Sequence, residues 1–424
     1  MRRAGPPMRC RVAATALSLA LFGAGGVAPA AEAATPGPSS APEYWFDDWH
    51  IHELWRAGVR GQGVTIAEID TGVNAALPQL AGRILPGRDF GNGGNGQVDR
   101  DVNAFGHGTA MASIMVARPG VLGIEGMAPA AKVLPVAVPL RGTTDQSAPG
   151  RLPEAIRWAA DHGARVISMS IGGTRTPDSP GGPCPADEQR AVFHALRVGA
   201  IVIAAVGNTG PTRNTVEEPG ACLGVVSVGA VDETGSVARF SAREPYLTLV
   251  APGVNIPSLG RVAGAAYAGD GTSQAAAIVS AAAALVWSRY PRLSGQQVVT
   301  RLLATVDDPH PRHSPAYGYG LLDAYRAVTA QAPASVGNPV YATAAPFLSQ
   351  YARPSTGLGK RPAPAATRRS LPRPSRLPVA SPASSSPEVP VGIGLAVLGL
   401  LALVAVVVLR GVSRRRLRSG VPRG

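Results

Sequence analysis

Hydrophobic positions in the central part of the chain alternate between short continuous runs and longer stretches with helical spacing. The short runs are rich in β-branched residues and predict buried strands at Val64–Ile69, Lys132–Val138, Val166–Ser170, Ile201–Ala205 and Val225–Val228. The stretches between them predict helices, as at Gly108–Ala117, Leu152–His162 and Asp187–Val198. Apolar strands that alternate with helices indicate an α/β fold with a parallel sheet covered by helices on both faces. Such a sheet carries its functional site at the carboxyl ends of its strands.

The two ends of the chain have different patterns. Residues 1–34 combine four arginines, an apolar run and small residues, which is typical of a secretory signal peptide; an uncleaved membrane anchor is the alternative. Residues 336–388 are rich in Pro, Ser, Ala and Arg without apolar periodicity and predict an extended linker. Residues 389–409 contain no charge and predict one transmembrane helix, since they would span about 30 Å; a buried helix of a soluble fold is the alternative. The arginine-rich residues 410–424 then predict a cytoplasmic carboxyl terminus.

The charge of the chain is concentrated in these end segments. The 424 residues are 45% hydrophobic, enough for a large core, and carry a formal net charge of +13. Residues 1–11, 336–388 and 410–424 carry all of the net positive charge, and the remaining residues are slightly acidic. The basicity therefore belongs to targeting, linker and tail segments, and it does not favour a nucleic-acid partner.

Cysteine usage fits an exported protein. Cys10 lies in the predicted signal peptide, which leaves Cys184 and Cys222 in the mature chain. A single pair in an exported domain favours one disulfide bond, and two free buried thiols are the alternative. By chain entropy such a bridge contributes roughly 4 kcal/mol of stability.

Four polar residues of catalytic type stand where a predicted strand ends or a helix begins. Asp70 and Asn208 each follow a buried strand, His107 lies between two glycines, and Ser273 opens a long Ala-rich run. Each residue alone also fits a turn, a helix cap or an ordinary hydrogen-bonded histidine. Together they supply a nucleophile, a general base, a carboxylate that orients the base, and an amide that donates to an oxyanion. The set therefore predicts serine-based hydrolysis of a carbonyl substrate.

These motifs resemble those of the subtilisin-like serine proteases, whose triad has the same chain order. The resemblance covers about residues 45–335 and rests on Asp70-Thr-Gly, His107-Gly-Thr, Ala205-Val-Gly-Asn208, Ala251-Pro-Gly253 and Gly271-Thr-Ser273. It implies a subtilisin-like three-layer fold over residues 60–335 and a serine endopeptidase that needs no cofactor or metal. It further implies that Asp70, His107 and Ser273 form the triad and that Asn208 is the oxyanion donor. An α/β-hydrolase esterase is excluded, because Gly-x-Ser-x-Gly does not surround Ser273.

The substrate is expected to be an extended protein or peptide. The segment Ser170-Ile171-Gly172 looks like the family's strand that pairs with the substrate backbone. Three positions depart from the family pattern. Glu68 stands where an aliphatic residue is usual, on the same strand face as Asp70, and a buried carboxylate there needs a partner or a proton. Ala277 and Ala281 replace a Pro and a Gly, which favours a regular helix after Ser273.

A closer resemblance is to the mycosins, the membrane-anchored subtilases of type VII secretion systems. It rests on the aromatic segment Trp45–Trp55, the cysteine pair, the Pro-rich linker, the single predicted span and the short interval before Asp70. It implies that residues 35–59 stay on the catalytic domain as an N-terminal extension. It also implies a single-pass membrane protein with an extracytoplasmic catalytic domain and a type VII secretion membrane complex as partner. A mainly structural role in that complex, with proteolysis secondary, is the alternative function.

Overall fold

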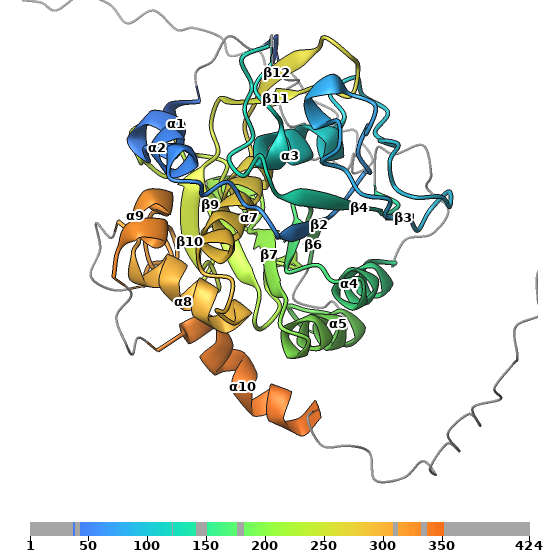
Figure 1. The fold of residues 1–424 in the computed structure, drawn as a ribbon. Coiled ribbons are helices and arrows are strands. Elements are labelled where there is room, and N and C mark those ends of the chain that lie inside the picture. Colours follow the sequence, from blue (N-terminus) through green and yellow to red (C-terminus); the bar gives the residue numbers. More distant parts are fainter. Residues whose placement is uncertain are drawn as a thin grey trace, which may run out of the picture. The chain divides into compact units, whose positions relative to one another are not determined.

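The computed structural model describes most of the chain from the aromatic segment to the start of the predicted linker (Figure 1). The described residues are 37–38, 43–120, 122–140, 151–175, 182–307, 313–331 and 337–351. They belong to one compact unit that runs to Ser355. The predicted signal peptide, transmembrane helix and cytoplasmic tail lie outside the described residues. Within those ranges we find no helix with the length and hydropathy of a membrane span.

The central sheet has seven strands, and every neighbouring pair is parallel. Its strand order is β10-β9-β7-β5-β2-β4-β3. The strands are β2 (Thr65–Asp70), β3 (Arg88–Asp89), β4 (Lys132–Ala137), β5 (Val166–Met169), β7 (Ile201–Ala205), β9 (Val226–Val231) and β10 (Leu249–Pro252). The predicted parallel sheet is confirmed, and all five strands expected from the sequence belong to it.

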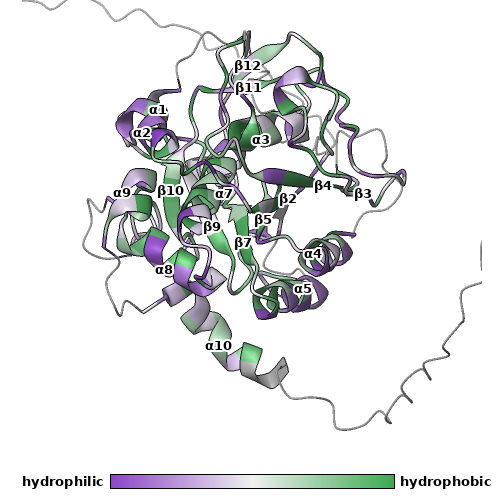
Figure 2. Cartoon of the chain, viewed as in Figure 1, coloured by the Kyte–Doolittle hydropathy of each residue, from purple (hydrophilic) through white to green (hydrophobic). Residues whose placement is uncertain are grey.

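Helices cover both faces of the sheet. On one face α3 (His107–Val116) and α7 (Thr272–Arg289) pack together, and on the other α4 (Leu152–Asp161) and α5 (Ala186–Arg197) do so (Figure 1). Right-handed crossovers produce this division, because the chain moves one way from β2 to β4 and then back across β2 to β5. The strands are therefore buried on both faces, and Figure 2 shows hydrophobic residues gathered on them.

The reversal of direction at β2 also fixes where a site forms. β2 lies between β4 and β5, so the connections after β2 and β5 leave in opposite directions from neighbouring strand ends. In open parallel sheets, ligands bind at such a switch point, at the carboxyl ends of the strands. Helix α7 approaches this region with its amino terminus, and its residues Thr272–Trp287 are buried, as expected of a helix that is apolar all round.

Smaller elements complete the unit. An antiparallel sheet contains β1 (Gly37–Pro38), β12 (Ala266–Gly269) and β11 (Ile256–Leu259), and a two-stranded antiparallel pair joins β6 (Gly173–Thr174) to β8 (Glu217–Glu218). The remaining helices, apart from those at the two ends of the unit, are η1 (Pro78–Leu80), α6 (Gly210–Arg213), α8 (Gly295–Ala304) and α9 (Ala324–Thr329).

The aromatic N-terminal segment forms two short helices, α1 (Tyr44–Asp48) and α2 (Ile51–Arg56), that are part of the main hydrophobic core. Trp45 is buried, and the indole N–H of Trp55 donates to the carbonyl of Met127 at 3.0 Å. Burial of this aromatic surface removes the cost that a loose segment would have in water. That the extension stays on the mature enzyme remains a prediction.

The predicted linker is wrong at its beginning. Residues Pro339–Tyr351 form helix α10, with Val340, Tyr341 and Ala344 buried. These apolar positions have helical spacing, Pro339 stands at the first helical position where it is well tolerated, and the Asn338 side chain accepts the N–H of Tyr341. The Pro-rich composition of the wider stretch hides this short pattern. The compact unit therefore extends past residue 335, where we expected it to end.

Cys184 and Cys222 are joined by a disulfide bond, with 5.0 Å between their Cα atoms. The bond ties the segment before α5 to the loop after β8, as the favoured alternative predicted. Glu188 lies close enough to both sulfur atoms to suggest a metal-type cluster, but sulfur atoms in a disulfide do not act as thiolate ligands.

Candidate active site

Asp70 and His107 meet at the switch point of the sheet. Asp70 is the last residue of β2 and is fully buried, and His107 is the first residue of α3. The Nδ1 atom of His107 lies 2.8 and 2.9 Å from the two carboxylate oxygens of Asp70. The N–H of Thr71 donates to the same carboxylate at 2.7 Å. This arrangement puts the proton on Nδ1 and leaves Nε2 to act as a base.

Side chains from the loops before α3 hold its amino terminus in place. The N–H groups of His107, Gly108 and Thr109 donate to Asp101, Thr71 and Asp99, respectively, at 2.9–3.0 Å. These are the free donors that begin every helix, and acidic acceptors there are also favoured by the helix dipole. The imidazole is thus fixed at its backbone as well as at Nδ1.

The charges around His107 favour its protonated form. Burial alone would lower the pKa of the imidazole, but the Asp70 carboxylate and its hydrogen bond, helped by Asp101 and Asp99, raise the pKa to about 8. The side chain is still 27% exposed, so substrate can reach it. A base with this pKa is half neutral near pH 8 and is well suited to accept a proton from a hydroxyl group.

Ser273 lies at the amino terminus of α7 and contacts the end of β5. Its hydroxyl donates to the carbonyl of Ser170 at 2.7 Å, and the Ser170 hydroxyl donates back to the carbonyl of Ser273 at 2.9 Å. Among the described residues, no hydrogen bond joins Ser273 Oγ to His107. The structure therefore forms the Asp–His half of the predicted triad directly, whereas the serine hydroxyl is turned to Ser170. Catalytic hydrogen bonds are often loose without substrate.

Asn208 lies beside Ser273 with its amide group oriented by Thr272. The Oδ1 atom of Asn208 accepts both the backbone N–H and the hydroxyl of Thr272, each at 2.9 Å. The Thr272 hydroxyl in turn accepts the N–H of Gly207. Because Oδ1 is occupied twice, the Nδ2 donor of the exposed Asn208 faces away from these partners and is available to a ligand.

Comparison with known proteins identifies the family. Residues 61–320 match the model of the subtilase family, Peptidase S8. The chain belongs to the subtilase family. It is therefore a serine endopeptidase, in agreement with the prediction from the four motifs.

Two relatives illustrate the similarity of this subtilase to characterised enzymes. Mycosin-3 of Mycobacterium tuberculosis is 32% identical over 372 residues, which cover 74% of this chain and 76% of the relative. Subtilisin DY of Bacillus licheniformis is 34% identical over 269 residues, which cover 63% of this chain and 91% of the relative. The match to Mycosin-3 extends beyond the region shared with the subtilisin.

Solved structures point to the same branch of the family. The MycP3 protease from the type VII (ESX-3) secretion system has a TM-score of 0.62 at 29% identity, with 69% of this chain and 89% of that chain covered. The structure of MycP1 with its N-terminal propeptide removed has a TM-score of 0.59 at 29% identity, with 70% and 99% covered. The expected resemblance to mycosins is thus confirmed.

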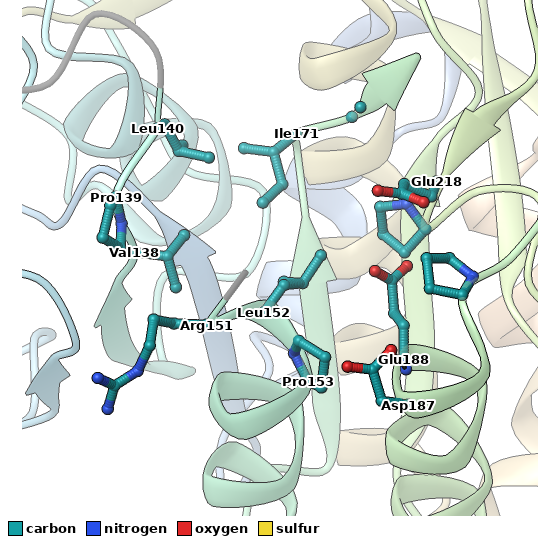
Figure 3. Close-up of a pocket in the computed structure, with 14 residues that line it drawn as sticks. Val138, Pro139, Leu140, Arg151, Leu152, Pro153, Ile171, Asp187, Glu188 and Glu218 are labelled. Atoms are coloured by element: carbon teal, nitrogen blue, oxygen red, sulfur yellow. Dashed lines mark hydrogen bonds between the residues drawn. The ribbon is translucent and has the colours of Figure 1, made fainter. Parts of the chain in front are cut away.

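The predicted substrate segment of this subtilase borders a pocket of about 330 Å³. Figure 3 shows Ile171 and Leu140 pointing into it, with Leu152 below them and Glu188 and Glu218 on another side. The segment Ser170–Gly172 follows β5 at the same edge of the sheet as Asp70. The structure therefore brings the predicted binding segment to the predicted catalytic residues.

Glu68, the departure noted in the sequence, is buried in β2 and only 1% exposed. Among the described residues, neither of its carboxylate oxygens has a hydrogen-bond partner. Burial, followed by the charges of Asp70 and Asp99, raises the pKa of Glu68 well above its usual range. The raised pKa favours the neutral form of this side chain, which lies two residues from the proposed catalytic carboxylate.

Sequence reasoning missed Glu217, whose carboxylate lies between Gly172 and Gly207. Both glycines leave room for it, because a Cβ added to either residue would approach its oxygens to about 2.6 Å. The only signal in the sequence was an acidic pair before a proline, Glu217-Glu218-Pro219, which is not specific.

Proposed function

We propose that this subtilase cleaves peptide bonds with Ser273 as nucleophile, His107 as general base and acid, and Asp70 as the carboxylate that orients His107. The contact of His107 Nδ1 with both oxygens of Asp70 carries the proposal. In the first step Nε2 of His107 takes the proton of the Ser273 hydroxyl, and Oγ forms a bond to the carbonyl carbon. The imidazolium then gives this proton to the leaving amine as the peptide C–N bond breaks, and water hydrolyses the ester by the same route.

The Ser273 hydroxyl must turn from Ser170 to His107 for this step. A rotation about χ1 between staggered rotamers would make this turn. A substrate paired with Ser170–Gly172 would compete for the polar groups of this segment and favour the turn. The Ser170 hydroxyl meanwhile keeps the backbone of Ser273 in place through its 2.9 Å hydrogen bond.

The negative oxygen formed in the addition step would be stabilised by Asn208 Nδ2 and the backbone N–H of Ser273. The two hydrogen bonds from Thr272 to Asn208 Oδ1 support this role, because they fix the direction of the amide before substrate arrives. Preorganised donors of this kind contribute roughly 3–4 kcal/mol to transition-state stability.

Residues Ser170–Gly172 would pair with an extended substrate as an added strand. This mode leaves the substrate's alternate side chains on opposite sides of its backbone. The pocket beside Ile171 is then a place for one of them, and its apolar lining from Val138, Leu140 and Leu152 favours an apolar side chain.

Cleavage of an unfolded protein by the purified full-length enzyme tests the triad. We expect Ser273→Ala to lower the rate by about 10⁴–10⁶. The matched control is Ser288→Ala on the same helix, because the Ser288 hydroxyl donates to the carbonyl of Leu285 at the opposite end of α7. Equal loss in both variants would show damage to the helix rather than to a nucleophile.

A second candidate function is a structural role in a secretion membrane complex. Its support is the similarity to the periplasmic assembly from the ESX-5 inner membrane complex, with a TM-score of 0.62 at 25% identity over 78% of this chain. Secretion measured in a strain with Ser273→Ala and in a strain without the gene separates the roles. Normal secretion in the first and loss in the second would assign the structural role.

The membrane topology belongs to the same proposal. The signal-like residues 1–34, the apolar residues 389–409 and the basic tail 410–424 support an extracytoplasmic enzyme on a single carboxyl-terminal span. Protease added to intact spheroplasts should remove the catalytic domain and leave the tail, and a protected catalytic domain would contradict the model. N-terminal sequencing of the active protein should give a start near residues 31–36, which would show that the aromatic extension is retained.

A further inference from the structure

Glu217 reaches from β8 into the space between the ends of two neighbouring strands of the central sheet. Gly172 follows β5 and Gly207 follows β7, and these strands are paired. A Cβ on Gly172 would lie 2.6 Å from Glu217 Oε2, and a Cβ on Gly207 would lie 2.6 Å from Oε1. Any side chain at either position would therefore displace the carboxylate. The space between the two glycines forms a slot, and the Glu217 carboxylate occupies it.

No cation from the described part of the chain pairs with the Glu217 carboxylate. The residue is only 8% exposed, and no Lys, Arg or His among the described residues forms an ion pair with it. Its neighbour Glu218, in contrast, lies 3.3 Å from Arg175. Burial raises the pKa of Glu217 to about 7, against a hydrogen bond from the Thr209 hydroxyl that lowers it. A buried acid of this kind is costly unless a partner arrives.

The slot lies where the proposed mechanism needs a substrate side chain. The inference rests on the proposed function, in which the scissile carbonyl lies between Ser273 Oγ and Asn208 Nδ2. Asn208 directly follows Gly207, and the Ser273 hydroxyl contacts the carbonyl of Ser170. The residue before the scissile bond is thus bracketed by Ser170–Gly172 on one side and by Gly207 and Asn208 on the other. Its side chain points into the space that ends at Glu217.

We propose that Glu217 is a specificity-determining residue that selects substrates with Lys or Arg immediately before the scissile bond. The ammonium or guanidinium group of the substrate would form an ion pair with the carboxylate in a site that excludes most water. The Glu217 carboxylate lies against both Gly172 and Gly207, so it would turn aside to pair with the cation as the long aliphatic part of Lys or Arg enters between the two glycines. A neutral side chain of the same length would leave the acid without its partner.

Peptide cleavage by the full-length protein tests the proposal. We compare kcat/KM for two peptides that differ only in having Lys or Met before the scissile bond, because Met has similar length and no charge. Wild type should prefer Lys by roughly ten- to hundredfold, the range of a buried hydrogen bond to a charged group. Glu217→Gln keeps the shape and removes the charge, and it should bring the ratio to within about threefold of one.

A neighbouring acid provides the matched control. Glu244 is also buried, but its carboxylate accepts from the Asn214 side chain. Glu244→Gln should therefore keep the preference for Lys. The inference is wrong if wild type shows no such preference, if Glu217→Gln retains it, or if Ala is preferred over both Lys and Met because Glu217 merely fills the slot.

Labelling with a fluorophosphonate serine probe separates this inference from the proposed function. Labelling of Ser273 without a preference for Lys would overturn the inference and leave the protease mechanism intact. If the protein is neither labelled by the probe nor able to cleave the peptides, both the inference and the proposed function are overturned. Labelled Glu217→Gln also shows that the variant is folded, so that a changed ratio reports the slot.

Discussion

Replacing Glu68 by Leu should stabilise the protein, and the gain should grow with pH. Glu68 is buried without a hydrogen-bond partner among the described residues, and burial and nearby acids raise its pKa well above the ordinary value of 4.5. The folded state therefore binds a proton that the unfolded state has lost. A group of this kind makes its full contribution below pH 4.5, and its contribution is lost as pH rises from 4.5 toward the folded pKa.

The structure gives the size of this effect as a slope. Over the pH range in which Glu68 is protonated in the folded state and ionised in the unfolded state, each pH unit lowers the free energy of unfolding by about 1.4 kcal/mol. Between pH 5.5 and 7.5 the advantage of Glu68→Leu over wild type should thus increase, at up to this slope while the pH stays below the pKa of Glu68 in the folded state. Other buried acids, such as Glu43 and Glu188, make the same pH-dependent contribution to the stability of both proteins, so they cancel in the difference between Glu68→Leu and wild type.

Urea unfolding followed by tryptophan fluorescence measures this difference. The five tryptophans all lie in the compact unit, so the signal reports its unfolding; they are Trp45, Trp49, Trp55, Trp158 and Trp287. Ser273→Ala in every sample prevents self-digestion. The control is Glu154→Gln on α4, whose side chain is 52% exposed and should give no dependence on pH. A difference between Glu68→Leu and wild type that stays constant over this pH range would refute the reasoning.

Three further predictions concern the base, the disulfide and the extension. Because the mechanism needs neutral His107 and the pKa of His107 is about 8, kcat/KM should fall about tenfold per pH unit well below pH 8. In initial-rate assays, Asp70→Asn should shift this acidic limb of the pH profile to lower pH and lower the rate about 10⁴-fold. An acidic limb that does not move would contradict the pairing of Asp70 with His107. Replacing Cys184 and Cys222 by Ser should lower stability by roughly 2–4 kcal/mol in urea unfolding, and an unchanged midpoint would contradict a stabilising bridge. Trp45→Ala should cost about 3–5 kcal/mol, whereas a loose extension would make it neutral.

The sheet and the positions of the candidate catalytic residues were the predictable part of this protein. Strands such as Ile201–Ala205 are buried on both faces, so their sequences are continuous apolar runs that stand out from the helices between them. The polar residues at the strand ends then stand out, because they interrupt these apolar runs. Their order along the chain supports the proposed mechanism, because the switch point brings the ends of β2, β5 and β7 together.

The missed features depend on contacts between distant parts of the chain. β10 and β12 are short and contain Ala, Gly or Pro, so no run identifies them. Helix α10 is hidden by the Pro-rich stretch that contains it. Glu217 meets Gly172 and Gly207 only because β8 folds back beside β6, and no local pattern encodes that meeting. The sequence did place Glu68 on the face of Asp70, but only the structure shows that it lacks a partner.

Labelling by a fluorophosphonate probe, with the modified residue mapped by mass spectrometry, tests the central claim most directly. The reagent forms a covalent bond only with a serine that a neighbouring base activates, so it reports the joint action of Asp70, His107 and Ser273. We expect one label on Ser273 in the wild-type protein, no label in Ser273→Ala, and labelling slowed at least a hundredfold in His107→Ala. Equal labelling of wild type and Ser273→Ala, or a label on another serine, would contradict the account.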